Sequence, residues 1–147
     1  MTSFTINHTS TATNAGIARE HDLCHYFGIE RTKHDSSDYK SNSDICLGER
    51  HISVKASSFS LMSGSLCGGY DEFEDIWTLY KNNTHSNEFA YITEDYTVYM
   101  MNLVEFEQFV HLFCRVERES SKNGGKAKIK MRKETHKTLA WLEQAVA

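Results

Sequence analysis

The sequence predicts a single α/β domain with a mixed (α+β type) sheet, and three observations support this expectation. The length of 147 residues is typical of one domain. Stretches with helical spacing of apolar residues are interleaved with shorter stretches of period-two spacing, which is typical of a sheet covered by helices. A hydrophobic fraction of 39% with 12% aromatic residues excludes a disordered chain and is sufficient for a core.

The first predicted helix follows a polar N-terminal segment. Residues 1–11 carry only a weak strand signal, so we expect a mobile segment there and a single domain over residues 12–147. A helix is predicted from about Thr13 to Phe27, and Gly28 ends it. Four residues share one face of this helix at helical spacing: Ile17, Glu20, Cys24 and Phe27.

A β-hairpin is predicted over residues 43–55. Gly48-Glu49 forms its two-residue loop, and glycine at the first loop position suits a type II′ turn. Pairing Leu47 with Arg50 across this loop aligns the alternating apolar residues of both strands on one face. These residues are Ile45, Leu47, Ile52 and Val54.

The opposite face of the predicted hairpin carries its charged residues. Asp44 lies opposite Ser53, and Lys55 is two residues further along the same strand. A carboxylate and an ammonium presented together at a strand end can hold a divalent metal and a phosphate. The alternative is a hairpin in which Asp44 only forms a turn and Lys55 is only solvated.

The remaining elements follow from the same two spacings and from capping residues. In chain order, the sequence predicts a Ser- and Gly-rich connection at 56–69, a helix capped by Asp71, strands at 89–92 and 98–101, a helix from Asn102 with Glu105 in a capping-box pattern, a hairpin of 114–119 with 126–132, and a helix at about 134–145.

The hairpin resembles the catalytic hairpin of the PD-(D/E)xK nucleases, which have the restriction-endonuclease-like fold. Asp44 matches the first carboxylate and Lys55 the lysine, whereas Ser53 stands where the family has a second acidic residue. The resemblance covers about residues 12–94 and implies a core of helix, hairpin, helix and strand. The C-terminal hairpin and helix would be additions to that core.

The resemblance implies a Mg²⁺ cofactor and a role for each residue of the site. Asp44 would bind the metal, with the Val54 carbonyl as a further ligand, and Glu20 of the first helix would add a carboxylate. Lys55 would stabilise the transition state or orient the attacking water. Ser53 could contact a metal-bound water through its hydroxyl.

A basic stretch near the C-terminus is a candidate DNA contact. The net charge is −4, yet residues 114–133 contain eight Lys or Arg and two Glu. Four cations project from one face of the predicted strand, at a spacing of about 7 Å: Lys126, Lys128, Lys130 and Arg132. The alternative is a solvated edge strand protected by lysines. Ser57 and Ser58 could also contact the DNA backbone, or belong to a flexible connector.

These features predict a Mg²⁺-dependent endonuclease that hydrolyses double-stranded DNA. A restriction enzyme and a homing endonuclease fit equally well. Cutting both strands with so small a chain calls for a homodimer or higher oligomer. The alternative is a non-catalytic DNA-binding protein on the same fold, in which Ser53 marks a decayed site. A zinc hydrolase is a more distant alternative, suggested by His21 and His25 one helical turn apart.

The predicted location is cytoplasmic, with no membrane association. The four cysteines are scattered, which favours reduced thiols. No apolar run approaches the length of a membrane span, and the first residues lack the basic start and apolar core of a secretory signal.

Overall fold

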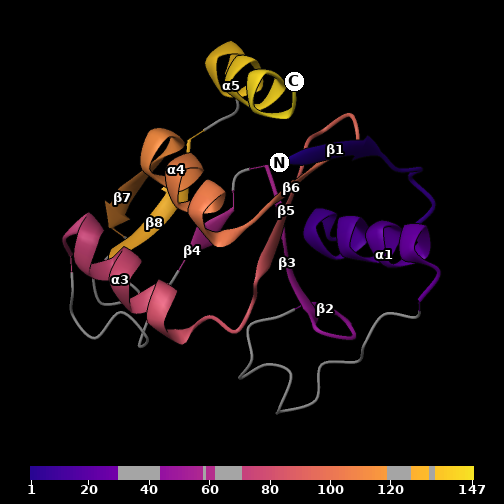
Figure 1. Ribbon diagram of the computed structural model, residues 1–147, viewed down its shortest axis with the longest axis horizontal. Coiled ribbons are helices and arrows are strands. Elements are labelled where there is room, and N and C mark those ends of the chain that lie inside the picture. Colours follow the sequence, from indigo (N-terminus) through magenta and orange to yellow (C-terminus); the bar gives the residue numbers. More distant parts are fainter. Residues whose placement is uncertain (30–43, 58, 62–70, 119–126, 133–134) are drawn as a thin grey trace.

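The computed structural model describes residues 1–29, 44–57, 59–61, 71–118, 127–132 and 135–147. Over these residues the chain forms four helices, a five-stranded mixed sheet and a three-stranded antiparallel sheet. The α/β expectation is therefore confirmed. Figure 1 shows α1 (Ala15–Phe27) on one side of the larger sheet, with α3 (Phe73–Asn83) and α4 (Leu103–Phe113) on the other.

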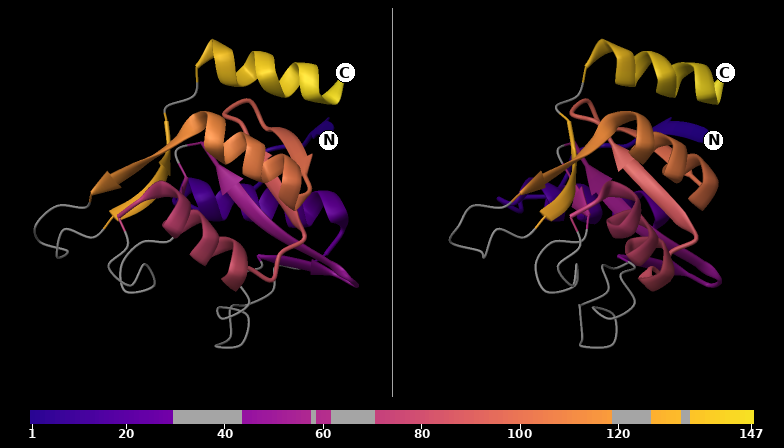
Figure 2. Two further views of the ribbon diagram at one scale, coloured as in Figure 1. Left: turned by 60° about the vertical axis from the view of Figure 1, so that its left-hand side comes forward. Right: turned by 90° about the vertical axis from the view of Figure 1, so that its left-hand side faces the viewer.

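The larger sheet has two parallel neighbours in an otherwise antiparallel arrangement. Its strand order is β1 (Thr2–Thr5), β6 (Thr97–Met101), β5 (Glu88–Ile92), β3 (Arg50–Ala56) and β2 (Ile45–Leu47). Strands β3 and β5 run parallel, so the chain must cross the sheet between them. That crossover contains α3, which consequently lies over the face of the sheet opposite to α1 (Figures 1 and 2).

Alternating side chains of the central strands feed two separate apolar clusters. Phe89 and Tyr91 of β5 join the larger cluster with residues of α3 and α4. Ala90 and Ile92 of the same strand join the smaller cluster, where Leu23 and Cys24 of α1 pack. The face to which a β3 side chain belongs thus decides which helix it meets.

The predicted hairpin is confirmed in its register and turn. Leu47 pairs with Arg50 and Ile45 with Ile52. Gly48 has a φ of 60°, a left-handed value that suits glycine at the first position of a type II′ turn. All four apolar residues of the hairpin belong to, or pack on, the α1-side cluster: Ile45, Leu47, Ile52 and Val54.

Residues at the start of β5 fasten the hairpin to the rest of the sheet. The Asn87 side chain accepts a hydrogen bond from the His51 amide at 2.9 Å and donates one to the Glu49 carbonyl at 2.9 Å. The Arg50 guanidinium donates to both carboxylate oxygens of Glu88, at 2.6 and 2.9 Å. These bonds fix the outer strands that carry the candidate site.

The N-terminal segment, for which a mobile stretch with a weak strand signal is predicted, forms strand β1 against β6. Phe4 stacks on Tyr26 of α1 with a centroid distance of 4.5 Å. The buried Asp22 accepts hydrogen bonds from the amides of Thr9 and Ser10 at 2.9 and 2.8 Å. The polar composition of residues 1–11 suggested a mobile segment. Packing and these bonds offset the conformational entropy that is lost when the segment is ordered.

The smaller sheet has the order β4 (Ser60–Leu61), β8 (Ala127–Met131), β7 (Cys114–Arg118). It adjoins α3 and α4, and α4 begins with the predicted capping box of Asn102 and Glu105. The last helix, α5 (His136–Val146), packs Trp141 against Phe113 and buries Leu142. None of the helices in the described parts of the chain is long and apolar enough to cross a membrane.

Candidate functional site

Asp44, Ser53 and Lys55 lie on one face of the larger sheet, as their spacing predicts. The Asp44 amide donates to the Ile52 carbonyl at 2.9 Å, which continues the β2–β3 pairing and places Asp44 opposite Ser53. Ser53 and Lys55 stand beside Phe89 and Tyr91 of β5, so they face the α3 side. Asp44 Oδ2 accepts the Val54 amide at 2.7 Å, and this bond fixes the orientation of the carboxylate.

Lys55 is half-buried and has Asp44 as its charged neighbour. Burial lowers the pKa of the Lys55 ammonium, and the negative charge of Asp44 opposes that shift. The Lys55 Nζ lies 5.8 Å from the centre of the Tyr80 ring, within the range of a cation–π contact. The site therefore holds a partly desolvated cation next to a carboxylate. Partial desolvation strengthens the interaction of the ammonium with an anion, and the carboxylate favours a cation beside it.

Ser53 is 1% exposed and belongs to a buried network of hydroxyl groups. Its Oγ lies 2.6 Å from Ser86 Oγ. Ser53 and Thr84 are also hydrogen-bond partners of the Tyr80 hydroxyl, whose pKa is raised chiefly by burial. The position where the resembled family has a second acid is thus occupied by a satisfied hydroxyl network.

Sequence reasoning missed Tyr80, Thr84 and Ser86 as residues of this site. Tyr80 lies on the buried face of α3 with Ile76 and Trp77. A buried tyrosine usually needs a hydrogen-bond partner for its hydroxyl. This requirement was the one signal that could have directed attention to the polar residues pointing inward from β3.

Glu20 and the Val54 side chain lie on the other side of the sheet. Val54 packs against the cluster that contains Leu23 and Cys24. Glu20 is buried on α1, which covers that same face. The structure therefore brings together three of the predicted residues, Asp44, Ser53 and Lys55, and places Glu20 in the helical layer behind the strand.

The residues at the site fit a Mg²⁺ ion held by one carboxylate. Mg²⁺ keeps several waters and needs only one or two carboxylates when phosphate oxygens complete its coordination. Asp44 uses Oδ2 for the Val54 amide, which leaves Oδ1 for a ligand. Across the described residues, no three His, Cys, Asp or Glu side chains form a group that could hold a metal ion, so tight binding by protein ligands alone is not expected.

His21 of α1 and the neighbouring Asp22 are engaged in local contacts. His21 Nδ1 lies 3.2 Å from Ser10 Oγ, and Asp22 between the two histidines binds His8 and the amides of residues 9 and 10. Asp22 is therefore committed to the N-terminal segment. This arrangement lends no support to the zinc hydrolase alternative.

Strand β8 carries the basic face of the smaller sheet. Ala127, Ile129 and Met131 are buried, whereas Lys128 and Lys130 are half-buried on the opposite face. β8 is flanked by both β4 and β7, so the alternative of a solvated edge strand does not apply. Lys126 and Ser58 lie outside the described residues.

A second strand extends this basic face. Arg115 of β7 pairs with Lys130, and Glu117 pairs with Lys128. Glu117 accepts a hydrogen bond from Arg115 Nη2 at 3.0 Å and lies 3.9 Å from Lys130 Nζ. We name Arg115, Lys128, Lys130 and Arg132 the basic face. Sequence reasoning missed Arg115, because the strand pairing that places it there was not used to look for further cations.

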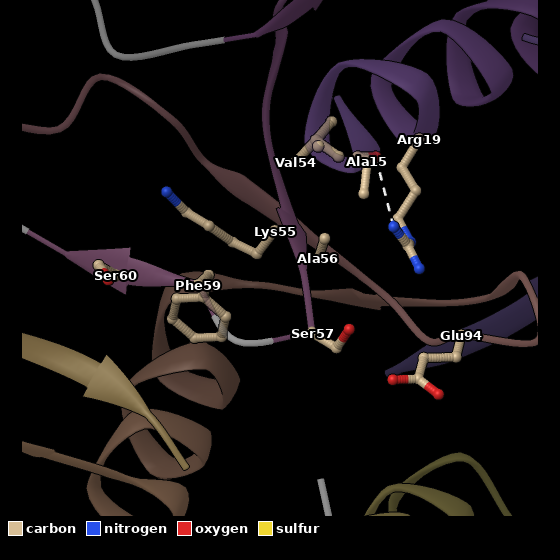
Figure 3. Close-up of a pocket in the computed structure, with 10 residues that line it drawn as sticks. Ala15, Arg19, Val54, Lys55, Ala56, Ser57, Phe59, Ser60 and Glu94 are labelled. Atoms are coloured by element: carbon tan, nitrogen blue, oxygen red, sulfur yellow. Dashed lines mark hydrogen bonds between the residues drawn. The ribbon is translucent and has the colours of Figure 1, made fainter. Parts of the chain in front are cut away.

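A pocket of about 580 Å³ lies where β3 ends, between α1 and β4. Its walls include Arg19, Lys55, Ser57 and Glu94, as Figure 3 shows. Lys55 extends from β3 away from Arg19, toward the α3 side, whereas Arg19 and Glu94 line the other end (Figure 3). Ser60 also lines the pocket and pairs with Lys130, so the pocket adjoins the basic face.

Comparison with protein-family models, with characterised proteins and with solved structures found no match for this chain.

Proposed function

We propose that the chain is a Mg²⁺-dependent endonuclease that hydrolyses phosphodiester bonds in double-stranded DNA, with a core like that of the PD-(D/E)xK nucleases. The observation that carries this proposal is the placement of Asp44 and Lys55 on one face of the hairpin, where the Asp44 carboxylate opposes the effect of burial on the pKa of the Lys55 ammonium. The order of α1, the β2–β3 hairpin, α3 and the parallel strand β5 supports the likeness to that core.

Each side chain has a defined task in this proposal. Asp44 Oδ1 would hold the metal, with the Val54 carbonyl as a further ligand. Mg²⁺, when bound, offsets the charge of the phosphate and lowers the pKa of a coordinated water. The Lys55 ammonium stabilises charge that develops on the phosphate oxygens, and half-burial strengthens this interaction.

The remaining predicted residues have weaker support. Glu20 would reach the metal through a water, but its helix covers the opposite face of the sheet. The Ser53 hydroxyl already lies 2.6 Å from Ser86 Oγ, so its contribution would be to hold Tyr80, whose ring lies beside the Lys55 ammonium. The basic face would bind the DNA backbone, and a homodimer would present two sites to the two strands.

A specific observation favours the second candidate, a non-catalytic DNA-binding protein. The second acidic position is Ser53, and its hydroxyl is satisfied by protein partners. Incubation of purified protein with supercoiled plasmid DNA in Mg²⁺ or EDTA separates the two functions. Nicked or linear product only in Mg²⁺ is expected from the endonuclease. Binding without any cleavage over a range of Mg²⁺ and Mn²⁺ concentrations would contradict the endonuclease and favour the second candidate.

A further inference from the structure

Arg19 presents a buried positive charge that the described part of the protein leaves largely uncompensated. The residue is 9% exposed, and its Nε has no hydrogen-bond partner within the described residues. Its Nη1 donates to the Ala15 carbonyl at 3.3 Å, and the guanidinium carbon lies 5.5 Å from the centre of the Tyr96 ring. A buried guanidinium with one long hydrogen bond and one aromatic contact is costly unless an anion joins it.

The Arg19 guanidinium lines the pocket at the end of β3, together with the first turn of α1. Figure 3 shows Arg19 beside Ala15, across the pocket from Glu94. Ala15 and Gly16 also line the pocket, and their amides have no acceptor within the helix. The N-cap Asn14 side chain accepts from the Ile17 amide, so it leaves these two donors available to a ligand. A helix N-terminus and a guanidinium both favour a negative group.

We infer that this pocket is a phosphate-binding site, in which the Arg19 guanidinium and the first-turn amides of α1 hold the phosphate oxygens. Ser57 adds a hydroxyl donor at the wall of the pocket. Arginine matches the geometry of phosphate through two parallel donors. Glu94 is exposed, so water screens its charge far more than that of Arg19. This inference concerns the α1 side of β3 and does not rest on the proposed endonuclease activity.

The phosphate has two chemical sources, a backbone phosphate of a nucleic-acid strand and a free phosphate or mononucleotide. The pocket volume of about 580 Å³ falls within the range of small-molecule sites, which suits the second source. The neighbouring Ser60–Lys130 pair connects the pocket to the basic face, which suits the first. Both sources share one recognition chemistry, and the experiment below distinguishes them.

The test is calorimetric titration with inorganic phosphate, in EDTA and at low ionic strength, so that neither metal nor cleavage takes part. The wild-type protein should bind one phosphate saturably, and Arg19→Gln should bind at least 10-fold more weakly. Ala15→Glu should also abolish binding while keeping or raising the Tm, because an acid in the first turn favours the helix. Glu94→Gln should tighten binding, and Lys137→Gln, a control at an exposed position of α5, should bind as the wild type does.

A short single-stranded oligonucleotide without terminal phosphate then identifies the source. If DNA supplies the phosphate, the oligonucleotide competes with inorganic phosphate. Arg19→Gln then reduces the magnitude of the slope of log K against log salt for oligonucleotide binding by about 0.7–0.9. If a free phosphate or nucleotide is the ligand, oligonucleotide binding is unchanged in Arg19→Gln while phosphate binding is lost. No saturable phosphate binding by the wild type, or equal binding by the folded Ala15→Glu protein, overturns the inference. A protein that binds phosphate here but never cleaves plasmid retains this site and loses only the endonuclease proposal.

Discussion

At the scale of single residues, Ser53 is the position that decides how the candidate site is interpreted. Its side chain is buried and bonded to Ser86 and Tyr80, so the residue is a structural part of the site as well as a departure from the resembled pattern. A carboxylate at this position would lie opposite Asp44 and could act as a second metal ligand. It would also bring two negative charges together.

Ser53→Glu should therefore lower the Mg²⁺ concentration needed for half-maximal cleavage and cost about 1–3 kcal/mol of unfolding free energy without metal, from overpacking and repulsion. A metal titration of cleavage and a denaturant titration in EDTA measure the two effects. Thr138→Glu is the control, because it buries the same acid at a hydroxyl of α5, outside the site, and should leave the metal requirement unchanged. An unchanged metal requirement in a folded Ser53→Glu protein would place Ser53 outside the metal site.

Asp22 is the residue that ties the N-terminal segment to α1. Burial alone would raise the pKa of its carboxyl, but hydrogen bonds from His8, Thr9 and Ser10 outweigh burial and lower the pKa. Asp22→Ala should destabilise the protein at pH 7 by about 2–3 kcal/mol, because several donors lose one acceptor. Denaturant unfolding measures this, with the exposed Asp75→Ala as control.

The pH dependence of this effect follows from the lowered pKa of Asp22. A carboxyl with a depressed folded-state pKa contributes stability above its unfolded pKa, near 3.8, and loses that contribution as pH falls through the folded-state value. The difference in unfolding free energy between Asp22→Ala and the wild type should therefore become smaller below pH 3.8. A difference that widens on acidification would contradict the role given to these hydrogen bonds.

At the scale of elements, β8 has one face in the core and one charged face. Its apolar side chains enter the larger cluster, and the opposite face of the strand bears Lys128 and Lys130. Since β8 is paired on both sides, protection of a free sheet edge does not explain the lysines. Phosphate contact is the role that we propose for these cations, which lie beside Arg115 of β7.

Replacing Lys126, Lys128, Lys130 and Arg132 by Gln should flatten the negative slope of log K against log salt for DNA binding. Its magnitude should fall by about 3–4, at about 0.9 per phosphate contact. Affinity should fall for every sequence alike, because phosphate contacts carry little base information. Stability should change little. Fluorescence anisotropy over a salt series measures the slope.

The control for this series is a pair of double variants. Lys128→Gln with Lys130→Gln should reduce the magnitude of the slope by about 2. Lys81→Gln with Lys137→Gln removes the same charge from exposed helix positions and should leave the slope unchanged. If both pairs reduce the magnitude of the slope equally, the basic face has no special role and DNA is attracted only by overall charge.

The sequence predicted elements whose cues are local, and it predicted less of what depends on tertiary contacts. The hairpin register followed from the alternation around Gly48-Glu49, and the end of α1 followed from Gly28, whose φ is 69°. The order of the strands within the two sheets could not be predicted, because pairing between distant segments leaves no local signal in the sequence. For the same reason β8 could be read as an edge strand, and Arg115 was missed.

The same division applies to the candidate site. Asp44, Ser53 and Lys55 share a face because strand side chains alternate, which the sequence alone determines. Tyr80 enters the site from α3, and Ser86 enters it from the connection between α3 and β5, so their positions required the fold. The proposed role of Glu20 depended on the side from which α1 approaches, and helical spacing does not specify that side.

At the scale of the whole molecule, the larger sheet separates the two proposed sites. Asp44 and Lys55 face α3, where the proposed cleavage would occur, whereas Arg19 and the first turn of α1 lie behind the same strand. The described residues contain one proposed cleavage site, so we expect double-strand cleavage to need two subunits. Single-strand nicks alone, made by a protein that sediments as a monomer, would contradict the proposed dimer.

The most direct test of the central proposal compares cleavage and binding in Asp44→Ala and Lys55→Ala. In the proposed mechanism both residues act on the reacting phosphate and its metal, whereas affinity would come mainly from phosphate contacts elsewhere. We expect Mg²⁺-dependent plasmid cleavage to fall at least 100-fold in each variant, while DNA affinity in Ca²⁺ stays within about threefold of wild type. The exposed Lys81→Ala should retain both activities. Cleavage near the wild-type rate in both site variants would contradict the assignment of this face of β3 as the active site.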